Sequence, residues 1–308
     1  MKTKKIFFAA IHLFFLNPHL FLYRIFLEFR AFVWPMPKGT VIKEIKGVRF
    51  PIPFDEGLRS ARSMYFDLYE MGVRFSMQRF LRCGDTFIDV GAKIGYISAL
   101  AAGFVGITGQ IHSFEPVAKP FGKLKKFAEI NSEYKIFSNQ VALSDQQGNA
   151  PMYIAKEGMG YSTMIRDLLG SMKQLETINV PVGRLDSYIE EHALHTIRII
   201  KIDVDGYEFL VLKGLENFFR NTRDLPVIIC EICPSAVSLS GSSLDELLQY
   251  MAQFSYVPFE VINPSKELNQ ETIARQWTTN VLFRPGYKSK IIMEHNESEN
   301  SRYSKKLA

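Results

Sequence analysis

The feature that most constrains this chain is the stretch GDTFIDVGAKIG at residues 84–95. Its apolar run, Thr86–Val90, is typical of a buried parallel strand. The glycine-punctuated turn Gly91–Gly95 follows, and a helical pattern then extends over Tyr96–Gly103. Glycines in such a turn let the backbone approach a ligand closely, although strand–glycine–helix turns also occur for packing alone. The stretch therefore predicts a loop that binds a nucleotide cofactor.

The spacing within this loop favours a cationic cofactor over a dinucleotide. A dinucleotide-binding turn has the pattern GxGxxG, which places a pyrophosphate on a helix N-terminus, and residues 84–95 lack that pattern. Asp89 lies two residues before the first glycine, and its carboxylate suits a cation and repels a diphosphate. S-adenosylmethionine therefore fits better than NAD. The predicted cofactor contacts in the loop are Asp89, Gly91, Ala92, Lys93 and Gly95.

A second predicted strand, Gln110–Phe114, ends in the dipeptide Glu115-Pro116. An acidic residue at the end of the second strand, about 20 residues past the glycine loop, is placed to accept both ribose hydroxyls of an adenosine. Pro116 ends the strand because proline cannot donate to a β-ladder. A glutamate on an ordinary surface turn is the alternative. We expect both Glu115 and Pro116 to contact the cofactor.

Acidic residues also follow the next two predicted strands. The third strand, Ile136–Leu143, runs into Asp145, and the fourth, Ile197–Ile202, runs into the sequence DVDGYE at residues 203–208. Open α/β sheets hold their ligands at the carboxyl ends of the strands. Ala142 and Asp145 are therefore further predicted contacts of the cofactor.

Five stretches follow one another in a fixed order: FIDVGAKIGYIS (87–98), SFEP (113–116), VALSDQQG (141–148), VPVGRLDSYI (180–189) and KIDVDGYEFLVLKG (201–214). In this order they resemble the FkbM-type S-adenosylmethionine-dependent methyltransferases, over Tyr65–Phe259. The resemblance implies an α/β fold with a Rossmann-like sheet, mostly parallel and closed by an antiparallel hairpin. It also implies methyl transfer, commonly to a hydroxyl of a sugar, glycan or natural product.

Two residues depart from the pattern of that family. Lys93 stands where asparagine is usual, and Asp205 stands where glutamate is usual. Asp205 keeps the charge on a shorter side chain, whereas Lys93 adds a cation inside the cofactor loop. Two other function classes therefore stay open. One is a membrane-associated Rossmann-like protein that binds without catalysis, and the other is an NAD-linked oxidoreductase, which would share Glu115 but should show GxGxxG.

The catalytic residues are expected after the fourth strand. Methyl transfer from a sulfonium needs an aligned nucleophile, and an alcohol acceptor needs a base for its proton. Asp203 and Asp205 are alternate residues and can project to the same side. We expect Asp203 to act as base or to position the acceptor, and Asp205 or Glu208 to orient it. The two aspartates lack an assignable third metal ligand, so no metal is expected, and His112 is interpreted as a core residue.

Composition narrows the remaining classes of function. A chain of 308 residues, 47% of them hydrophobic, can form one large α/β domain with accessory elements. The net charge of +5 is spread along the chain, which disfavours nucleic-acid binding. Cys230 and Cys233, at the end of a predicted fifth strand Pro226–Cys230, are expected to be reduced thiols rather than half of a zinc site. The predicted partner is a small-molecule or glycan acceptor, and the predicted location is the cytoplasm.

The N-terminal segment is uneven in charge. Met1–Lys5 is basic and Ile6–Leu16 is almost wholly apolar, but that run is shorter than the roughly 20 residues that span a bilayer. Leu20–Trp34 carries three charges in a helical pattern rich in Phe and Leu. Such a helix lies in a membrane interface, with the basic start favoured by anionic lipid, or else caps the catalytic core. The first alternative predicts peripheral contact of residues 1–34 with the inner face of the membrane.

Four segments are expected along the chain. They are an apolar helical segment (1–35), a hairpin and helical cap (36–82), the methyltransferase domain (83–286) and a disordered polar tail (287–308). The cap holds the hairpin Thr40–Phe50 and the helical pattern Arg59–Arg82. The methyltransferase domain includes an insertion, Asp145–Thr196, with the glycine- and hydroxyl-rich loop Gly158–Thr163, and a closing hairpin formed by Val257–Ile262 and Asn280–Phe283.

Overall fold

The computed structural model describes residues 18–56, 58, 60–155, 162–170 and 175–286. Three predicted features fall outside these residues: the apolar run Ile6–Leu16, most of the loop Gly158–Thr163, and the polar tail at 287–308.

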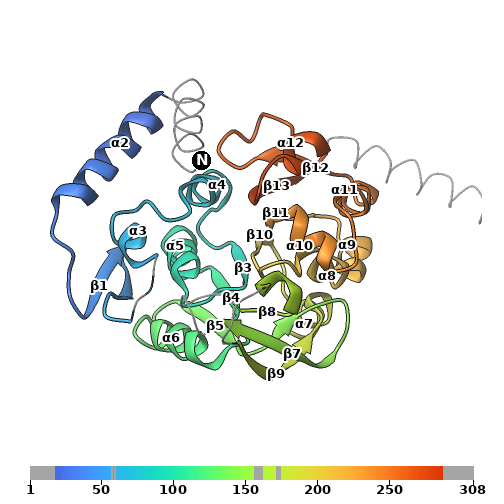
Figure 1. Ribbon diagram of the computed structural model, residues 1–308, viewed down its shortest axis with the longest axis horizontal. Helices are drawn as coiled ribbons and strands as arrows, with labels where there is room; N and C mark the ends of the chain where they lie inside the picture. The colour runs from blue at the N-terminus through green and yellow to red at the C-terminus, as the bar shows by residue number, and fades with distance from the viewer. Residues whose placement is uncertain (1–17, 57, 59, 156–161, 171–174, 287–308) are drawn as a thin grey trace, which may run out of the picture.

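A seven-stranded sheet forms the centre of the fold. Its strands are β3 (Thr86–Val90), β4 (Gln110–Phe114), β5 (Lys135–Asn139), β10 (Ile197–Ile202), β11 (Val227–Ile232), β12 (Tyr256–Glu260) and β13 (Thr279–Pro285). Their order across the sheet is β12-β13-β11-β10-β3-β4-β5 (Figure 1). The strands from β5 to β11 pair in parallel, whereas β13 is antiparallel to both β11 and β12. The predicted fold class, including the antiparallel closing hairpin, is confirmed.

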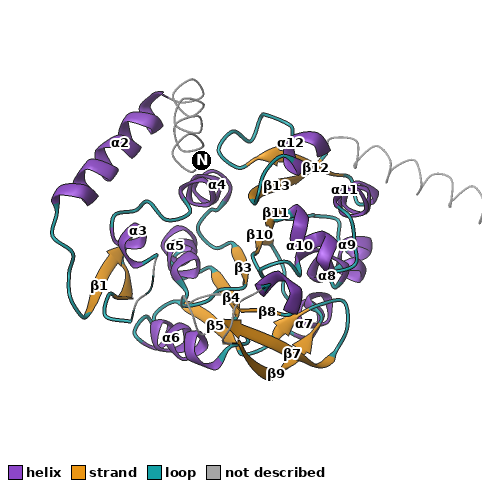
Figure 2. Cartoon of the chain, viewed as in Figure 1, coloured by secondary structure: helices purple, strands orange, loops and turns teal. Residues whose placement is uncertain are grey.

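Helices cover both faces of this sheet (Figure 2). Phe87 of β3 belongs to a core formed with helices α4 (Met71–Phe80), α5 (Tyr96–Val105) and α6 (Ala118–Glu129). Its neighbour Ile88 belongs to a second core, on the opposite face, because successive strand residues alternate in direction. The helices that contribute to the second core are α7 (Leu185–Glu191), α8 (Glu208–Lys213), α9 (Glu216–Asn221), α10 (Pro234–Leu239), α11 (Leu244–Gln253) and α12 (Gln270–Ala274).

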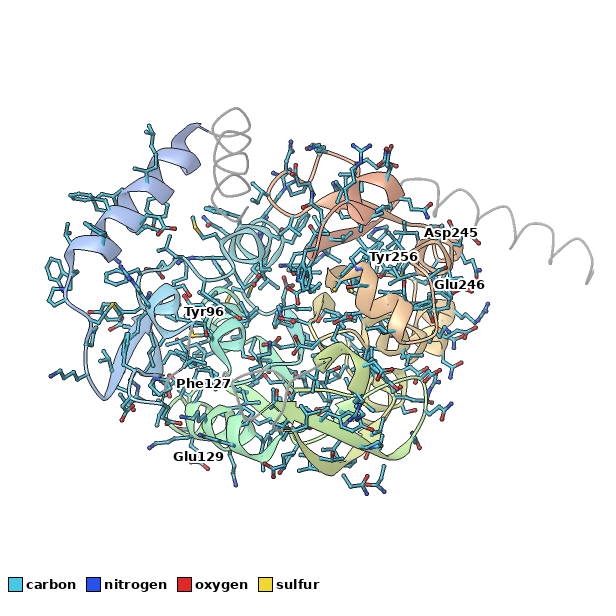
Figure 3. The ribbon with its side chains drawn as sticks, in the orientation of Figure 1. Tyr96, Phe127, Glu129, Asp245, Glu246 and Tyr256 are labelled. Atoms are coloured by element: carbon cyan, nitrogen blue, oxygen red, sulfur yellow. The ribbon has the colours of Figure 1, made fainter. Side chains whose placement is uncertain are left out.

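The N-terminal hairpin is also confirmed, and it continues to residue 53. Strands β1 (Thr40–Ile45) and β2 (Val48–Pro53) are joined at Lys46 and Gly47, whose φ angles of 51° and 87° suit a tight hairpin turn. Phe50 packs its ring edge to face against Tyr96 and Phe127, with centroids 5.4 and 5.5 Å away. Tyr96 and Phe127 are labelled in Figure 3. These contacts hold the hairpin against α5 and α6.

The helical pattern predicted over Arg59–Arg82 is two helices rather than one. They are α3 (Ala61–Tyr65) and α4, and the turn between them includes Asp67 and Glu70 with φ angles of 63° and 49°. Positive φ angles are incompatible with a continuous right-handed helix, so the chain must turn here. The turn places Tyr69 at the edge of a cavity described below.

The predicted third strand, Ile136–Leu143, is wrong in its extent. The chain leaves the central sheet after β5, and residues 142–143 (β6) pair with β9 (Leu175–Gly183) in a separate four-stranded sheet. This sheet has the order β6-β9-β7-β8, with β7 (Gly148–Ala155) and β8 (Ser162–Thr163), and η1 (Arg166–Leu169) follows it in sequence. Strands β7, β8 and β9 of this sheet lie in the insertion Asp145–Thr196, for which the sequence predicted a glycine- and hydroxyl-rich loop but no second sheet.

Helix α2 (Pro18–Val33) lies at one side of the molecule (Figure 1). Leu27 is buried, and the guanidinium of Arg30 lies 5.4 Å from the ring centre of Phe66. Most of the apolar side chains that can be placed on α2 are exposed, including Phe29 at 63% and Phe32 at 82%. Among the described helices, none is long and apolar enough to cross a membrane.

Candidate active site

The glycine loop after β3 is tied to the end of β4. The backbone N–H groups of Gly91 and Ala92 donate to the carbonyl oxygen of Phe114 at 3.0 and 2.9 Å. Gly91 has a φ angle of +82°, and a Cβ there would lie 1.8 Å from the backbone oxygen of Asp203. Glycine is therefore required at 91 because three strand ends meet there, rather than because the N–H groups of 91 and 92 are free for a ligand.

Glu115 lies at the end of β4 and joins the loop to the next helix. One carboxylate oxygen accepts the N–H of Lys93 at 3.0 Å, and the other accepts the N–H of Val117 at 2.9 Å. The side chain is almost wholly buried, and burial raises the pKa of Glu115 to about 7, although both hydrogen bonds oppose the rise. A buried carboxylate that keeps two acceptor oxygens at a strand end fits the predicted ribose contact.

Asp89 lies inside the same crevice. Its Oδ2 accepts the hydroxyl of Ser98 at 2.6 Å, and its Oδ1 makes no hydrogen bond within the described part of the chain. Complete burial raises the pKa of Asp89, and the nearby ammonium of Lys201 opposes that rise. A cationic or hydrogen-bonding ligand would supply the partner that this buried oxygen lacks.

A cavity of about 570 Å³ opens in front of these groups. Its walls come from the glycine loop, the ends of β4 and β10, the turn before α4, and strands β7 and β9. A smaller cavity of about 40 Å³ shares Gly91, Lys93, Glu115 and Asp203 with it and extends toward Pro116 and Ala142. The combined space, lined by the carboxylates of Asp89, Glu115 and Asp203 among others, fits a cofactor and leaves room for an acceptor.

Most of the predicted site residues line these two cavities. They are Asp89, Gly91, Ala92, Lys93, Glu115, Pro116, Ala142, Asp203 and Asp205. Three predicted residues do not line either of them: Gly95, Asp145 and Glu208.

Each of the three residues outside the cavities has another contact. A Cβ on Gly95 would lie 2.9 Å from Leu124 and Phe127, so this glycine allows close packing at the start of α5. Asp145 accepts the hydroxyl of Ser144 at 3.0 Å. Glu208 is buried, and its Oε1 accepts the backbone N–H groups at positions 204 and 206, each at 3.0 Å, so it shapes the turn that carries Asp205.

Asp203 begins the turn after β10 and is paired with a lysine that sequence reasoning gave no role. The ammonium of Lys201 lies 2.9 Å from Asp203 Oδ2, and both side chains are almost wholly buried. Burial alone would raise the pKa of Asp203, but Lys201 and Lys93 together hold it below its usual range. Asp203 is therefore a carboxylate that stays charged and is a weak proton acceptor.

The two departures from the family pattern contact each other. Lys93 Nζ lies 3.6 Å from Asp205 Oδ2, and both residues have a φ angle of 52°. Burial raises the pKa of Asp205, and Lys93 opposes that rise. The pair connects the glycine loop with the turn after β10.

A third carboxylate, which sequence reasoning missed, joins the two aspartates. One ligand atom each from Asp203, Asp205 and Glu231 lie within 4.8 Å of one another. Burial and the charge of Asp203 raise the pKa of Glu231. Glu231 stands between Cys230 and Cys233 in the sequence. The signal was its place at the end of a fifth strand, in register with the other acidic strand ends.

His112 is a core residue, as predicted. Its ring stacks on Phe137 with centroids 4.7 Å apart, and Nδ1 lies 2.9 Å from the hydroxyl of Tyr188. Burial lowers the pKa of His112 to about 4. Cys230 is buried, whereas Cys233 is partly exposed.

Fold and site together define a Rossmann-like protein with an acidic cofactor crevice at the carboxyl ends of its parallel strands. A profile described as "Methyltransferase FkbM domain" matches residues 89–258, which is more than half of the 308-residue chain. The chain belongs to the FkbM methyltransferase family. This confirms the resemblance seen in the sequence and S-adenosylmethionine as the cofactor.

Individual proteins that resemble this chain have low sequence identity to it or match only part of it. The 31-O-demethyl-FK506 methyltransferase FkbM of Streptomyces tacrolimicus is 30% identical over 165 residues, which cover 44% of this chain and 62% of that protein. The chain thus matches less than two thirds of that relative's length. A putative rRNA-methylase from Clostridium thermocellum has 11% identity and a TM-score of 0.42, covering 68% of this chain and 92% of that one. A putative methyltransferase from Streptococcus mutans in complex with SAH has 8% identity and a TM-score of 0.40, and the match covers 68% of this chain and 93% of that one.

Proposed function

We propose that this protein is an O-methyltransferase that acts on a hydroxyl of a sugar, glycan or natural product. The observation that carries the proposal is the cavity of about 570 Å³, which extends from Glu115 and the glycine loop past Asp203 to strands β7 and β9. The family match supports methyl transfer, and the relative from Streptomyces tacrolimicus is named for methylation at an oxygen.

The cofactor residues we propose are those that line the crevice. Glu115 would accept the ribose hydroxyls, and Asp89 and Asp203 would face the cationic part of the cofactor. Asp89 Oδ1 has no hydrogen-bond partner among the described residues. Bound S-adenosylmethionine supplies a methyl group on a positively charged sulfur. The walls of the cavity would align the acceptor and exclude water, which can lower a barrier by roughly 7–11 kcal/mol.

The catalytic roles follow from the charges of the turn after β10. Asp203, which stays ionised beside Lys201, would position the acceptor hydroxyl. Asp205, whose pKa is raised by burial, is the better group to take the hydroxyl proton. Glu208 would act through the turn that it caps rather than by touching the acceptor.

Calorimetry with S-adenosylmethionine, followed by a labelled-methyl screen over sugars, lipid-linked glycans and polyketide alcohols, tests this proposal. Binding with transfer to a hydroxyl supports it. Binding without transfer to any acceptor class would favour the alternative of a protein that binds without catalysis. Binding of NAD in place of S-adenosylmethionine would overturn the methyltransferase assignment, and the lack of GxGxxG after β3 argues against that outcome.

We further propose that the N-terminal segment contacts the inner face of the membrane without spanning it, in a protein of the cytoplasm. The exposed apolar side chains of α2, among them Phe26, Phe29 and Phe32, support this, as does the exposed Trp34 just after the helix. So does the basic start of the sequence, Met1–Lys5, which anionic lipid would attract. Co-sedimentation with phosphatidylserine vesicles should depend on this segment. Full-length protein that stays in the supernatant would instead favour a helix that only caps the core.

A further inference from the structure

Carboxylates from three elements gather around the turn after β10. Oxygens of Asp203, Asp205 and Glu231 lie within 4.8 Å of one another, and Glu70, held by the side-chain amide of Asn280 at 2.9 Å, adds a fourth carboxylate nearby. Carboxylates this close cannot all stay ionised unless a proton or a cation compensates them. In many proteins such a group holds a divalent metal.

Lys201 compensates only part of the negative charge of these carboxylates. Its ammonium bonds to Asp203 Oδ2 at 2.9 Å from the interior side of the cluster. Asp203 also shares a side-chain hydrogen bond with Glu231, so one proton lies between these two carboxyl groups. The side of the cluster that carries Asp205 therefore needs a second cation.

Lys93 reaches that side from the glycine loop. Its Nζ lies 3.6 Å from Asp205 Oδ2, and Asp203 is the group that most strongly stabilises its charge. Its backbone is held in place, because the N–H of Lys93 donates to Glu115 and the residue has a φ angle of 52°. The ammonium is thus delivered to the carboxylates from a fixed point on a neighbouring strand end.

We propose that the ammonium of Lys93 is the built-in cation of this carboxylate cluster and takes the position that a divalent metal would otherwise occupy. Lys93 is then a positioning residue, which holds Asp203 and Asp205 in place in the crevice. It also makes the site independent of metal, because a divalent ion beside a fixed ammonium would be repelled. The inference concerns the same crevice as the proposed methyl transfer, but it does not depend on the identity of the acceptor.

The test is Mn²⁺ binding to the full-length protein, measured by electron paramagnetic resonance without cofactor or acceptor. Lys93→Asn removes the cation and suits the backbone, because asparagine tolerates a positive φ angle. Wild-type protein should bind Mn²⁺ weakly, and Lys93→Asn about 100-fold more tightly. Lys93→Arg, which restores a cation, should return to the weak binding of the wild type.

A second substitution assigns the ligands. Lys93→Asn combined with Glu231→Gln should lose the gained Mn²⁺ affinity, since one of the three carboxylates is gone. Melting temperatures of all variants check folding, and Lys93→Gly replaces Lys93→Asn if that variant is unstable.

Two results would overturn the inference. One is equally tight Mn²⁺ binding in wild type and Lys93→Asn, which would make the cluster a metal site that ignores Lys93. The other is no gain of binding in any folded variant without the lysine, which would show that the cluster needs no cation there. Neither result bears on whether the protein transfers methyl groups, so failure here is distinct from failure of the proposed function.

Discussion

Two regions of the molecule depart from the usual burial of side chains, and they do so in opposite ways. One is the crevice at the carboxyl ends of β3, β4 and β10, and the other is helix α2. The crevice buries charge: Asp89, Glu115, Lys201 and Asp203 are each at least nine-tenths buried. Helix α2 exposes apolar groups, with Phe32 at 82%. Buried charges and exposed apolar surfaces are the two departures from ordinary burial that carry functional information.

The two regions differ in how they affect stability. Charges in the crevice are desolvated, so each raises or lowers the free energy of unfolding according to its partners and the pH. Exposed apolar groups on α2 lose nothing on unfolding, because they are already in water. The crevice should therefore respond strongly to substitution in stability and in activity, whereas α2 should respond only when a membrane is present.

The largest effect is expected for Gly91→Ala, which breaks the crevice sterically. The new Cβ would lie 1.8 Å from the backbone oxygen of Asp203, so strand ends must separate. Urea denaturation should show a loss of more than about 4 kcal/mol, or no folded protein. Gly241→Ala is the matched control, because Gly241 has the same φ angle of +82° and its Cβ would meet no described atom within 4 Å. Equal losses in both would mean that backbone strain alone sets the effect.

Next in size is the effect of removing the charge of Asp203. Asp203→Asn keeps the shape, and turnover should fall about 100-fold because the carboxylate no longer positions the acceptor hydroxyl. The dissociation constant of S-adenosylmethionine, measured by calorimetry, should change less. Asp205→Asn is compared in parallel. Loss of cofactor affinity with turnover intact at saturation would place Asp203 against the amino-acid part of the cofactor instead.

A smaller effect, opposite in sign, is expected for Glu208→Gln. Burial raises the pKa of Glu208 from 4.5 to about 7. Between these pH values the folded chain holds a proton that the unfolded chain has released, so this group's contribution to stability falls as the pH rises through the window. The variant should be more stable than wild type by about 2 kcal/mol at pH 8 and no different near pH 4.

Chemical denaturation at several pH values measures this difference. Glu271→Gln is the control, because the side chain of Glu271 is 70% exposed and its substitution should change the free energy of unfolding little. A difference between wild type and Glu208→Gln that does not vary with pH would contradict the assignment.

The smallest effect on stability is expected for substitutions on the exposed face of α2, in contrast to those in the crevice. Replacing Phe29 and Phe32 together by serine should change the free energy of unfolding by less than about 0.5 kcal/mol, because both side chains are exposed. Leu27→Ala, at a buried position of the same helix, should cost about 2 kcal/mol. The double serine variant should nonetheless lose vesicle binding. A large loss of stability would show that the exposed face packs against the protein in solution.

The sequence alone determined the strands that build the site. The bounds predicted for β3, β4 and β10 agree with the structure to the residue, because each strand is followed directly by a glycine turn or an acidic residue. The same ends located Asp89, Glu115 and Asp203 at one edge of a parallel sheet. Periodicity and local turn chemistry are properties of neighbouring residues, so they can be read along the chain.

Only the tertiary structure decided which of these groups meet. Glu231 joins Asp203 because β11 is the neighbour of β10, and Lys93 reaches Asp205 because β3 lies on the other side of β10. The order of strands depends on how helices pack on both faces of the sheet, and one strand's sequence does not record it. For the same reason the sequence did not predict that the chain leaves the central sheet after β5, although the polar residues 138–140 interrupt the stretch 136–143 at that point. The charge of a crevice is set by the groups that the fold brings together, and their separation in sequence does not reveal it.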